Sequence, residues 1–138
     1  MPHLTLEYSA NLADEANLAA LCAKLAHALD TQRDASGARV YPRGGIRTRA
    51  LRCEQYFIAD GDAQNAFLHG CLKIGAGRSA QVRKATGDAL FEAIKEHFAE
   101  AFASHGLALS LEIVEFSEEG SWKHNNLHAR LKGRSPKC

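Results

Sequence analysis

Hydrophobic and polar residues alternate at the start of the chain. Leu4, Leu6 and Tyr8 are separated by polar residues, which is the period-two pattern of a strand with one buried face. Pro2 precedes this run, and proline is accepted at the first position of a strand because it has no N–H to give to a ladder. The pattern therefore predicts a strand that begins directly after Pro2.

A helical pattern follows this strand. Asn11, with Asp14 three residues later, resembles a helix start. Beyond it, apolar residues share one helical face: Leu18, Leu21, Cys22, Leu25 and Leu29. Residues 30–45 are rich in Asp, Ser, Gly and Arg and predict a loop that ends at the pair Gly44-Gly45.

A second extended run is predicted over residues 46–59. In a strand, Arg47, Arg49 and Leu51 would share one face because side chains alternate. The sequence Asp60-Gly61-Asp62 then signals a turn.

The second half of the chain repeats this order. An apolar strand over residues 67–74 leads into a tight turn, and Ser79 is a candidate N-cap. A long helix follows, with its apolar positions at helical spacing: Val82, Leu90, Ile94, Phe98 and Phe102. Gly106 is a candidate left-handed stop for that helix. A last strand over residues 107–113 changes phase at Val114 and Phe116, which predicts a bulge or a strand end there.

The order β-α-β-β-α-β predicts an α+β fold with a four-stranded mixed sheet and two helices on one face. The other face of the sheet would be uncovered, and a symmetric oligomer is the simplest cover. We expect residues 1–132 to form a single domain, with a polar, basic tail from residue 117 that is anchored by Trp122, Leu127 and Leu131. Residues 133–138 are expected to be disordered.

Composition narrows the function classes. The chain of 138 residues has a formal net charge of +1, so overall charge gives no reason to expect a nucleic-acid or membrane partner. No apolar run reaches membrane-spanning length, and no signal-peptide pattern opens the chain. Four cysteines are scattered without a C-x-x-C pair, which indicates reduced thiols and a cytoplasmic protein.

Pro2 is the first candidate for chemistry. The small residue Pro2 allows Met1 to be trimmed, and the nitrogen of Pro2 then becomes a secondary amine. An α-amino group has a pKa of about 7.7–8.0, and burial or nearby cations lower it. Such an amine is partly neutral near pH 7 and can act as a general base.

Two arginines are candidate anion clamps. Arg47 follows the glycine pair before the second strand, and Arg78 lies in Gly75-Ala76-Gly77-Arg78-Ser79 at the mouth of the second helix. Arginine is permanently charged and its planar fork matches a carboxylate. Near an amine base, two such groups would suit a small polycarboxylate. Alternatively, both are surface arginines that pair with glutamates.

Other motifs carry little weight. The Gly75-Ala76-Gly77 turn half-matches a dinucleotide fingerprint but lacks the strand order and acidic partner of that fold. His124 and His128 have helical metal-ligand spacing without a third ligand. A row of arginines could bind nucleic acid, namely Arg43, Arg47, Arg49 and Arg52. Such a surface would need more aromatic residues nearby to stack on the bases. We therefore expect no metal and no cofactor.

Four segments in order resemble one enzyme family. They are Met1-Pro2-His3-Leu4-Thr5-Leu6-Glu7, Gly45-Ile46-Arg47-Thr48-Arg49, Leu72-Lys73-Ile74-Gly75-Ala76-Gly77-Arg78-Ser79 and Trp122-Lys123-His124-Asn125-Asn126-Leu127-His128-Ala129. Together they are similar to the 5-carboxymethyl-2-hydroxymuconate Δ-isomerases of the tautomerase superfamily, whose chains start with a proline. The resemblance runs from Pro2 to about Lys132.

The resemblance implies a cofactor-free isomerase in homoprotocatechuate breakdown and a homotrimer whose sheets face the threefold axis. It implies that Pro2 is the general base and that Arg47 and Arg78 hold substrate carboxylates. Arg49 shares a face with Arg47, and Trp122 is either an aromatic wall of the site or a packing anchor. Two alternatives stay open: a tautomerase of another 2-hydroxydienoate or an enolpyruvate, and a non-enzymatic binding protein on the same fold.

Overall fold

A computed structural model describes residues 1–12 and 16–134 of the chain. Its elements, in order, are β1 (His3–Ser9), η1 (Ala10–Leu12), α1 (Leu18–Asp30), η2 (Arg43–Gly45), β2 (Arg47–Cys53), β3 (Ala66–Gly75), α2 (Ala80–His97), α3 (Ala99–Ser104), β4 (Leu107–Phe116), η3 (Glu118–Gly120) and α4 (Leu127–Leu131).

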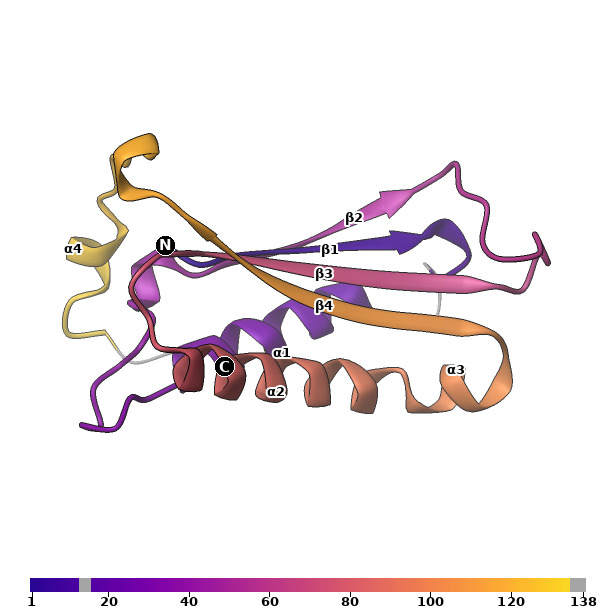
Figure 1. Cartoon of the computed structure of the whole chain (residues 1–138), viewed down its shortest axis with the longest axis horizontal. Helices are drawn as coiled ribbons and strands as arrows, with labels where there is room; N and C mark the ends of the chain where they lie inside the picture. The colour runs from indigo at the N-terminus through magenta and orange to yellow at the C-terminus, as the bar shows by residue number, and fades with distance from the viewer. Residues whose placement is uncertain (13–15, 135–138) are drawn as a thin grey trace.

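The sheet has the strand order β2-β1-β3-β4. β1 and β2 are parallel, β3 and β4 are parallel, and the central pair β1 and β3 is antiparallel. Helices α1 and α2 lie side by side against one face of this sheet (Figure 1). The predicted α+β architecture, with a mixed four-stranded sheet and two helices on one face, is confirmed.

The core lies between the sheet and these two helices. Leu4 and Leu6 of β1 are fully buried, as the alternating pattern predicts. They pack with fully buried residues of the other elements, namely Leu21, Leu25, Leu29, Leu68, Leu72, Ile74, Leu90 and Ile94. Burial of this apolar surface is the main source of stability. It also determines which face of each strand points away from the helices and can contact a substrate or another chain.

The first helix begins later than the sequence indicates. Its N-cap is Asn17, whose side chain accepts a hydrogen bond from the backbone N–H of Ala20 at 3.2 Å. Asn11 lies in η1 instead, and its side-chain amide donates to the carbonyls of Ala63 and Asn65. The prediction of a helix start at Asn11 is therefore wrong, and Asp14 lies outside the described residues. The second cap prediction is confirmed, because Ser79 accepts from the N–H of Val82.

The second extended run is shorter than predicted, because β2 ends at Cys53 and a loop follows. The second helix is interrupted at Phe98, which separates α2 from α3. Gly106 does not have the left-handed backbone predicted for it. It is needed for a close approach, since a Cβ there would lie 2.7 Å from the side-chain oxygen of Asn65.

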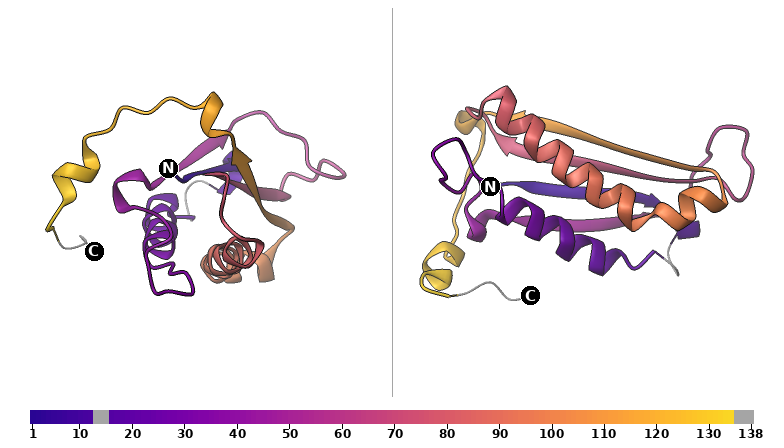
Figure 2. Two further views of the ribbon diagram at one scale, coloured as in Figure 1. Left: turned by 60° about the vertical axis from the view of Figure 1, so that its left-hand side comes forward. Right: turned by 90° about the horizontal axis from the view of Figure 1, so that it is seen from below.

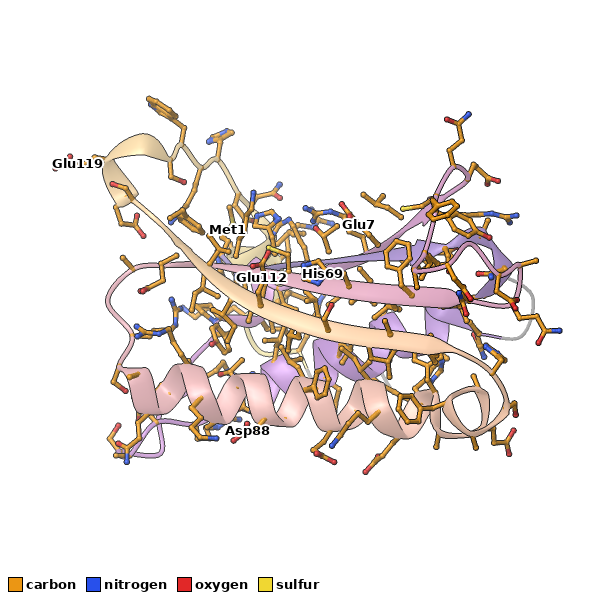
Figure 3. All side chains as sticks on the ribbon, turned by 45° about the vertical axis from the view of Figure 1, so that its right-hand side comes forward. Met1, Glu7, His69, Asp88, Glu112 and Glu119 are labelled. Atoms are coloured by element: carbon orange, nitrogen blue, oxygen red, sulfur yellow. The ribbon has the colours of Figure 1, made fainter. Side chains whose placement is uncertain are left out.

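β4 has no bulge, and it ends at Phe116, which is one of the two positions where the pattern predicts a bulge or a strand end. Its pairing with β3 runs in one unbroken register from Leu107, opposite Ala66, to Phe116, opposite Gly75. Val114 and Phe116 therefore belong to the sheet face away from the helices. That face also carries Glu7, His69 and Glu112, which Figure 3 shows at the strands and away from the helix layer.

The C-terminal segment crosses one end of the sheet. It leaves β4, passes the amino terminus and ends in α4 beside η2 (Figure 2). The contact between α4 and η2 is close, because a Cβ on Gly44 would lie 2.8 Å from the backbone nitrogen of His128. Arg43 donates to the carbonyl of Arg134; the rest of the predicted tail, residues 135–138, lies outside the described residues.

Cys22, Cys53 and Cys71 are free thiols, and Cys138 lies outside the described residues. Within residues 1–12 and 16–134, no helix has the length and apolar character required to cross a membrane.

Candidate active site

The amino terminus lies at the end of the sheet where β1 and β2 begin and β3 and β4 end. Pro2 is buried, and its carbonyl accepts a hydrogen bond from the N–H of Arg47 at 3.1 Å. This bond extends the parallel β1–β2 pairing by one step. The sheet therefore holds Pro2 at a fixed place beside the first residue of β2.

The side chain of Met1 lies between two other segments. A Cβ on Gly45 would be 3.2 Å from its Cγ, and the side-chain amide of Asn125 is 3.5 Å from its sulfur. The same amide donates to the carbonyl of Gly44 at 3.1 Å. The crossing C-terminal segment is thus tied to the amino terminus and to η2.

Arg47 is held by the turn that precedes it. Its guanidinium donates to the carbonyl of Gly45 at 2.9 Å and to that of Gly44 at 3.4 Å. These bonds restrict the rotation of the Arg47 side chain, so less conformational entropy is lost when Arg47 binds an anion.

Arg78 is fixed from three sides. It donates to the carbonyls of Gly75 and Val40 at 3.1 and 3.2 Å, and its guanidinium carbon lies 4.7 Å from the centre of the Tyr41 ring. Tyr41 is itself fully buried and shares a hydrogen bond of 2.9 Å with the hydroxyl of Thr86. A cation over an aromatic face is stabilised by the ring quadrupole, so Arg78 is anchored on the core.

The electrostatics of this end act on the amino group. Burial lowers the pKa of the Met1 amino group, and the positive charges of Lys123, Arg78 and Arg47 lower it further, while Glu118 opposes them. Each cation disfavours the charged form of the amine. The structure thus brings Arg47 and Arg78 to the amino terminus, as the candidate site requires.

Arg49 lies two residues further along β2, on the face of the sheet away from the helices. One of its guanidinium nitrogens is 3.3 Å from Nδ1 of His3. Burial, and then the charges of Arg49 and Arg47, lower the pKa of His3. Arg49 therefore shares a face with Arg47 as predicted, and its contact in this chain is a histidine of β1 rather than the amino terminus.

Trp122 does not anchor the tail, because it is 88% exposed. The ammonium of the next residue, Lys123, lies 3.3 Å from the carboxylate of Glu118, and its charge lowers the pKa of the Met1 amino group. Lys123 was missed as a site residue because nothing in the letters around it marks a charge near the amino terminus. Tyr41 was missed as the support of Arg78, since a tyrosine in a polar loop gives no sign that it is buried.

The alternative motifs do not assemble. His124 precedes α4 and His128 lies within it, against Gly44. The described part of the chain holds no group of three His, Cys, Asp or Glu side chains suited to a metal ion. The four arginines considered for nucleic-acid binding have separate partners, namely Asp30 for Arg43, the η2 carbonyls for Arg47, His3 for Arg49 and Glu54 for Arg52.

Chemically, this end of the sheet combines an amine of lowered pKa with guanidinium groups held in place. An amine that loses its proton easily can accept one from a substrate and return it. Fixed cations bind carboxylates and stabilise negative charge that develops on oxygen. The arrangement suits proton transfer within a small polycarboxylate.

Comparison with known proteins agrees with this reading. The family model described as CHMI, 5-carboxymethyl-2-hydroxymuconate isomerase, matches residues 2–131. The chain is 42% identical over 132 residues to a 5-carboxymethyl-2-hydroxymuconate Delta-isomerase of Escherichia coli, covering 96% of this chain and 100% of the relative. It is 50% identical to the crystal structure of a 5-carboxymethyl-2-hydroxymuconate isomerase from Deinococcus radiodurans R1, with a TM-score of 0.84 and coverage of 94% and 92%.

A more distant structure shares the fold. It is described as a fused 4-OT wild type symmetric trimer, with 19% identity, a TM-score of 0.64 and coverage of 96% of this chain and 99% of that one. The family match spans nearly the whole chain and includes every segment that builds the site. The chain belongs to the 5-carboxymethyl-2-hydroxymuconate isomerase family, and it is an isomerase.

Proposed function

We propose that the chain converts 5-carboxymethyl-2-hydroxymuconate into its conjugated 2-oxo isomer, without a cofactor, in the breakdown of homoprotocatechuate and 4-hydroxyphenylacetate. Family membership supports the reaction. Removal of Met1 would leave the nitrogen of Pro2 as a secondary amine, and that amine is the proposed general base.

The reaction moves one proton along a conjugated system. The Pro2 nitrogen takes the proton of the 2-hydroxyl group, the oxygen becomes a carbonyl, and the double bonds shift by one position. The protonated amine then gives a proton to C5, so the base returns to its starting state. One group of intermediate pKa serves both steps because it acts first as a base and then as an acid.

Arg47 and Arg78 are the proposed carboxylate clamps. Each is positioned by backbone carbonyls at the end of the sheet that holds Pro2. Their charge would bind the ends of the substrate and stabilise the oxygen from which the proton is taken. The single observation that supports the proposal is the position of Pro2, whose carbonyl accepts from the N–H of Arg47 at 3.1 Å, at the end of the sheet where the charges of Arg47 and Arg78 lower the pKa of the Met1 amino group.

The proposed assembly is a homotrimer. The sheet face away from the helices is uncovered in one chain and carries both signs of charge, with Glu7 and Glu112 near Arg49 and Lys73. A face with mixed charges can pair with another copy of itself, and a structural relative is described as a symmetric trimer. The exposed Trp122 is proposed to complete the wall of a site in a neighbouring copy.

Light scattering after size-exclusion chromatography tests this assembly. The measured mass should be that of three chains, and a stable monomer would contradict the trimer.

A steady-state assay tests the function. Purified protein with Met1 removed, as checked by intact mass, should turn over 5-carboxymethyl-2-hydroxymuconate faster than plain 2-hydroxymuconate. Pro2→Ala keeps a primary amine in place of the secondary one, and it should lose most but not all of the turnover. Equal preference for another 2-hydroxydienoate would favour a different tautomerase, and unchanged turnover in Pro2→Ala would reject Pro2 as the base.

A further inference from the structure

The C-terminal segment over residues 117–126 forms a strap across the amino-terminal end of β1 (Figure 2). At its start, the N–H of Ala76 donates to the carbonyl of Phe116 at 3.2 Å. At its end, Asn125 donates to the carbonyl of Gly44 and contacts the sulfur of Met1. Both ends are thus fixed to turns that hold the candidate clamps.

Side chains of the strap point in different directions. Trp122 is almost fully exposed, while Asn125 contacts Met1 and Gly44. The ammonium of Lys123 lies 5.6 Å from the centre of the Phe116 ring and 3.3 Å from Glu118. The strap therefore places one cation over the Phe116 ring at the end of β4, where a third of its side chain is exposed.

Lys123 is connected to Arg78 through the turn after β3. The carboxylate of Glu118 lies against Gly75, since a Cβ there would be 3.0 Å from Oε1. The carbonyl of Gly75 accepts a hydrogen bond from Arg78 at 3.1 Å. Lys123 is thus linked through Glu118 to the same residue, Gly75, that holds Arg78, whereas Arg47 is held by the carbonyls of η2.

The charges at this end are not balanced within the chain. Three cations act on the amino group, Lys123, Arg78 and Arg47, and Glu118 is the acidic side chain that acts with them. Among the charged side chains, Lys123 has the largest effect. Glu118 offsets one of these three cations, so a substrate with three carboxylates would match the three cations if one carboxylate takes the place of Glu118.

The ion pair between Lys123 and Glu118 can be replaced by an ion pair between Lys123 and a substrate carboxylate. Two thirds of the Glu118 side chain is exposed, so the pair gains little from its Coulomb attraction in water. A substrate carboxylate can replace Glu118 while water solvates the released side chain. Lysine also differs from arginine in this role, because its ammonium is a point charge on a flexible stem that can follow a flexible carboxymethyl arm.

We infer that Lys123 is a specificity residue that binds the carboxylate of the carboxymethyl arm, in exchange for Glu118. The inference rests on the proposed function. It assigns the third carboxylate of the substrate to the strap and leaves the two muconate carboxylates to the arginines.

The test compares two substrates that differ by this arm. Lys123→Met keeps the apolar stem beside Phe116 and removes the charge, and Lys123→Arg keeps a charge. We expect Lys123→Met to lower kcat/KM for 5-carboxymethyl-2-hydroxymuconate by about 10- to 100-fold, the range of a charged hydrogen bond, mainly through KM. For 2-hydroxymuconate the loss should be less than about threefold, and Lys123→Arg should restore most of the difference.

Lys84→Met is the matched control. Lys84 is exposed on α2, where it pairs with Asp88 at 2.8 Å, so its loss should not change the ratio of the two substrates. Assays are made at a pH above the amine pKa, because removal of any nearby cation raises that pKa. An equal loss for both substrates in Lys123→Met would overturn the assignment. Failure of the proposed function looks different, since the unaltered enzyme would then turn over neither substrate or would show no preference for 5-carboxymethyl-2-hydroxymuconate.

Discussion

The two ends of the sheet are built alike, yet they carry different chemistry. At one end, the N–H of Arg47 donates to the carbonyl of Pro2 at 3.1 Å where the parallel strands β1 and β2 begin. At the other end, the N–H of Ala66 donates to the carbonyl of Gly106 at 3.0 Å where β3 and β4 begin. The backbone therefore offers the same geometry twice.

The side chains at the two ends differ. Beside Pro2, cations converge on an amino group and lower its pKa. Beside Ala66, charged groups hold loops: the carboxylate of Asp60 accepts from the amide of Asn65 at 2.8 Å and from the N–H of Asp62 at 3.1 Å. These bonds lower the pKa of Asp60. The comparison teaches that the fold provides the same backbone geometry at both ends of the sheet. The side chains placed at each end then decide whether that end can transfer a proton.

The largest difference between the two ends of the sheet is the proposed basic amine at Pro2, and removing its basicity tests this difference most directly. An amino-terminal extension that keeps the Pro2 nitrogen in an amide should lower kcat/KM by about 10²- to 10⁴-fold, because the general base is lost. A cleavable extension that leaves Pro2 as the first residue provides the control, since cleavage should restore the rate. Full activity with the extension in place would rule out the base.

The next largest effect is expected from the clamps. Arg78→Ala should lower kcat/KM for a polycarboxylate by about 10- to 100-fold, as a charged hydrogen bond is worth about 1.5–3 kcal/mol. Arg52→Ala removes an arginine that pairs with Glu54 beyond the opposite end of β2, and its steady-state rate should match that of the unaltered protein. If both variants lose the same activity, the two ends of the sheet are not functionally distinct.

A third test concerns the strap and its anchor. Gly44→Ala would place a Cβ 2.8 Å from the backbone of His128, so α4 must shift. Overpacking of this kind costs about 1–3 kcal/mol, which urea denaturation should detect as a lower free energy of unfolding. Gly120→Ala is the control, because a Cβ there meets no atom within 4 Å. Equal stability of the two variants would show that the α4 contact is dispensable.

The smallest expected effect is a shift in the pH dependence of kcat/KM, which tests how the charges at the amino-terminal end of the sheet act on the amine. Burial and then the charges of Lys123 and Arg78 lower the pKa of the Met1 amino group, and we expect the same surroundings to lower the pKa of the Pro2 amine that removal of Met1 exposes. The neutral form of that amine is the proposed base. Log kcat/KM should therefore rise with pH by about one per unit and level off below the usual 7.7–8.0. Arg78→Ala should move this inflection upward, and Arg52→Ala should not. An inflection above pH 8 in the unaltered protein would contradict the environment described for the amine.

Much of the fold could be predicted from the sequence because its strands follow a strict alternation, as Leu4 and Leu6 show. Boundaries were less predictable where tertiary contacts override local signals. Asn11 has the residue type of an N-cap, but its side chain bonds to carbonyls across the sheet end. Gly106 has the residue type of a helix stop, but Asn65 requires its small size.

The candidate site divides in the same way. Pro2, Arg47 and Arg78 could be named because each stands at a strand end or turn that the pattern marks. Lys123 could not be found in this way, because it lies in a segment without regular structure. Its position depends on contacts of Asn125 and His128 with a distant turn, and spacing along the chain does not encode such contacts.

The place of Met1 has a practical consequence. Its side chain lies between Gly45 and Asn125, directly before the proposed base Pro2. We expect trimming of this residue to remove this side chain and create the free amine in one event. Aminopeptidase processing would then act as an on-switch for each newly made chain. Batches from overloaded expression hosts should accordingly show specific activities that scale with the fraction of processed molecules.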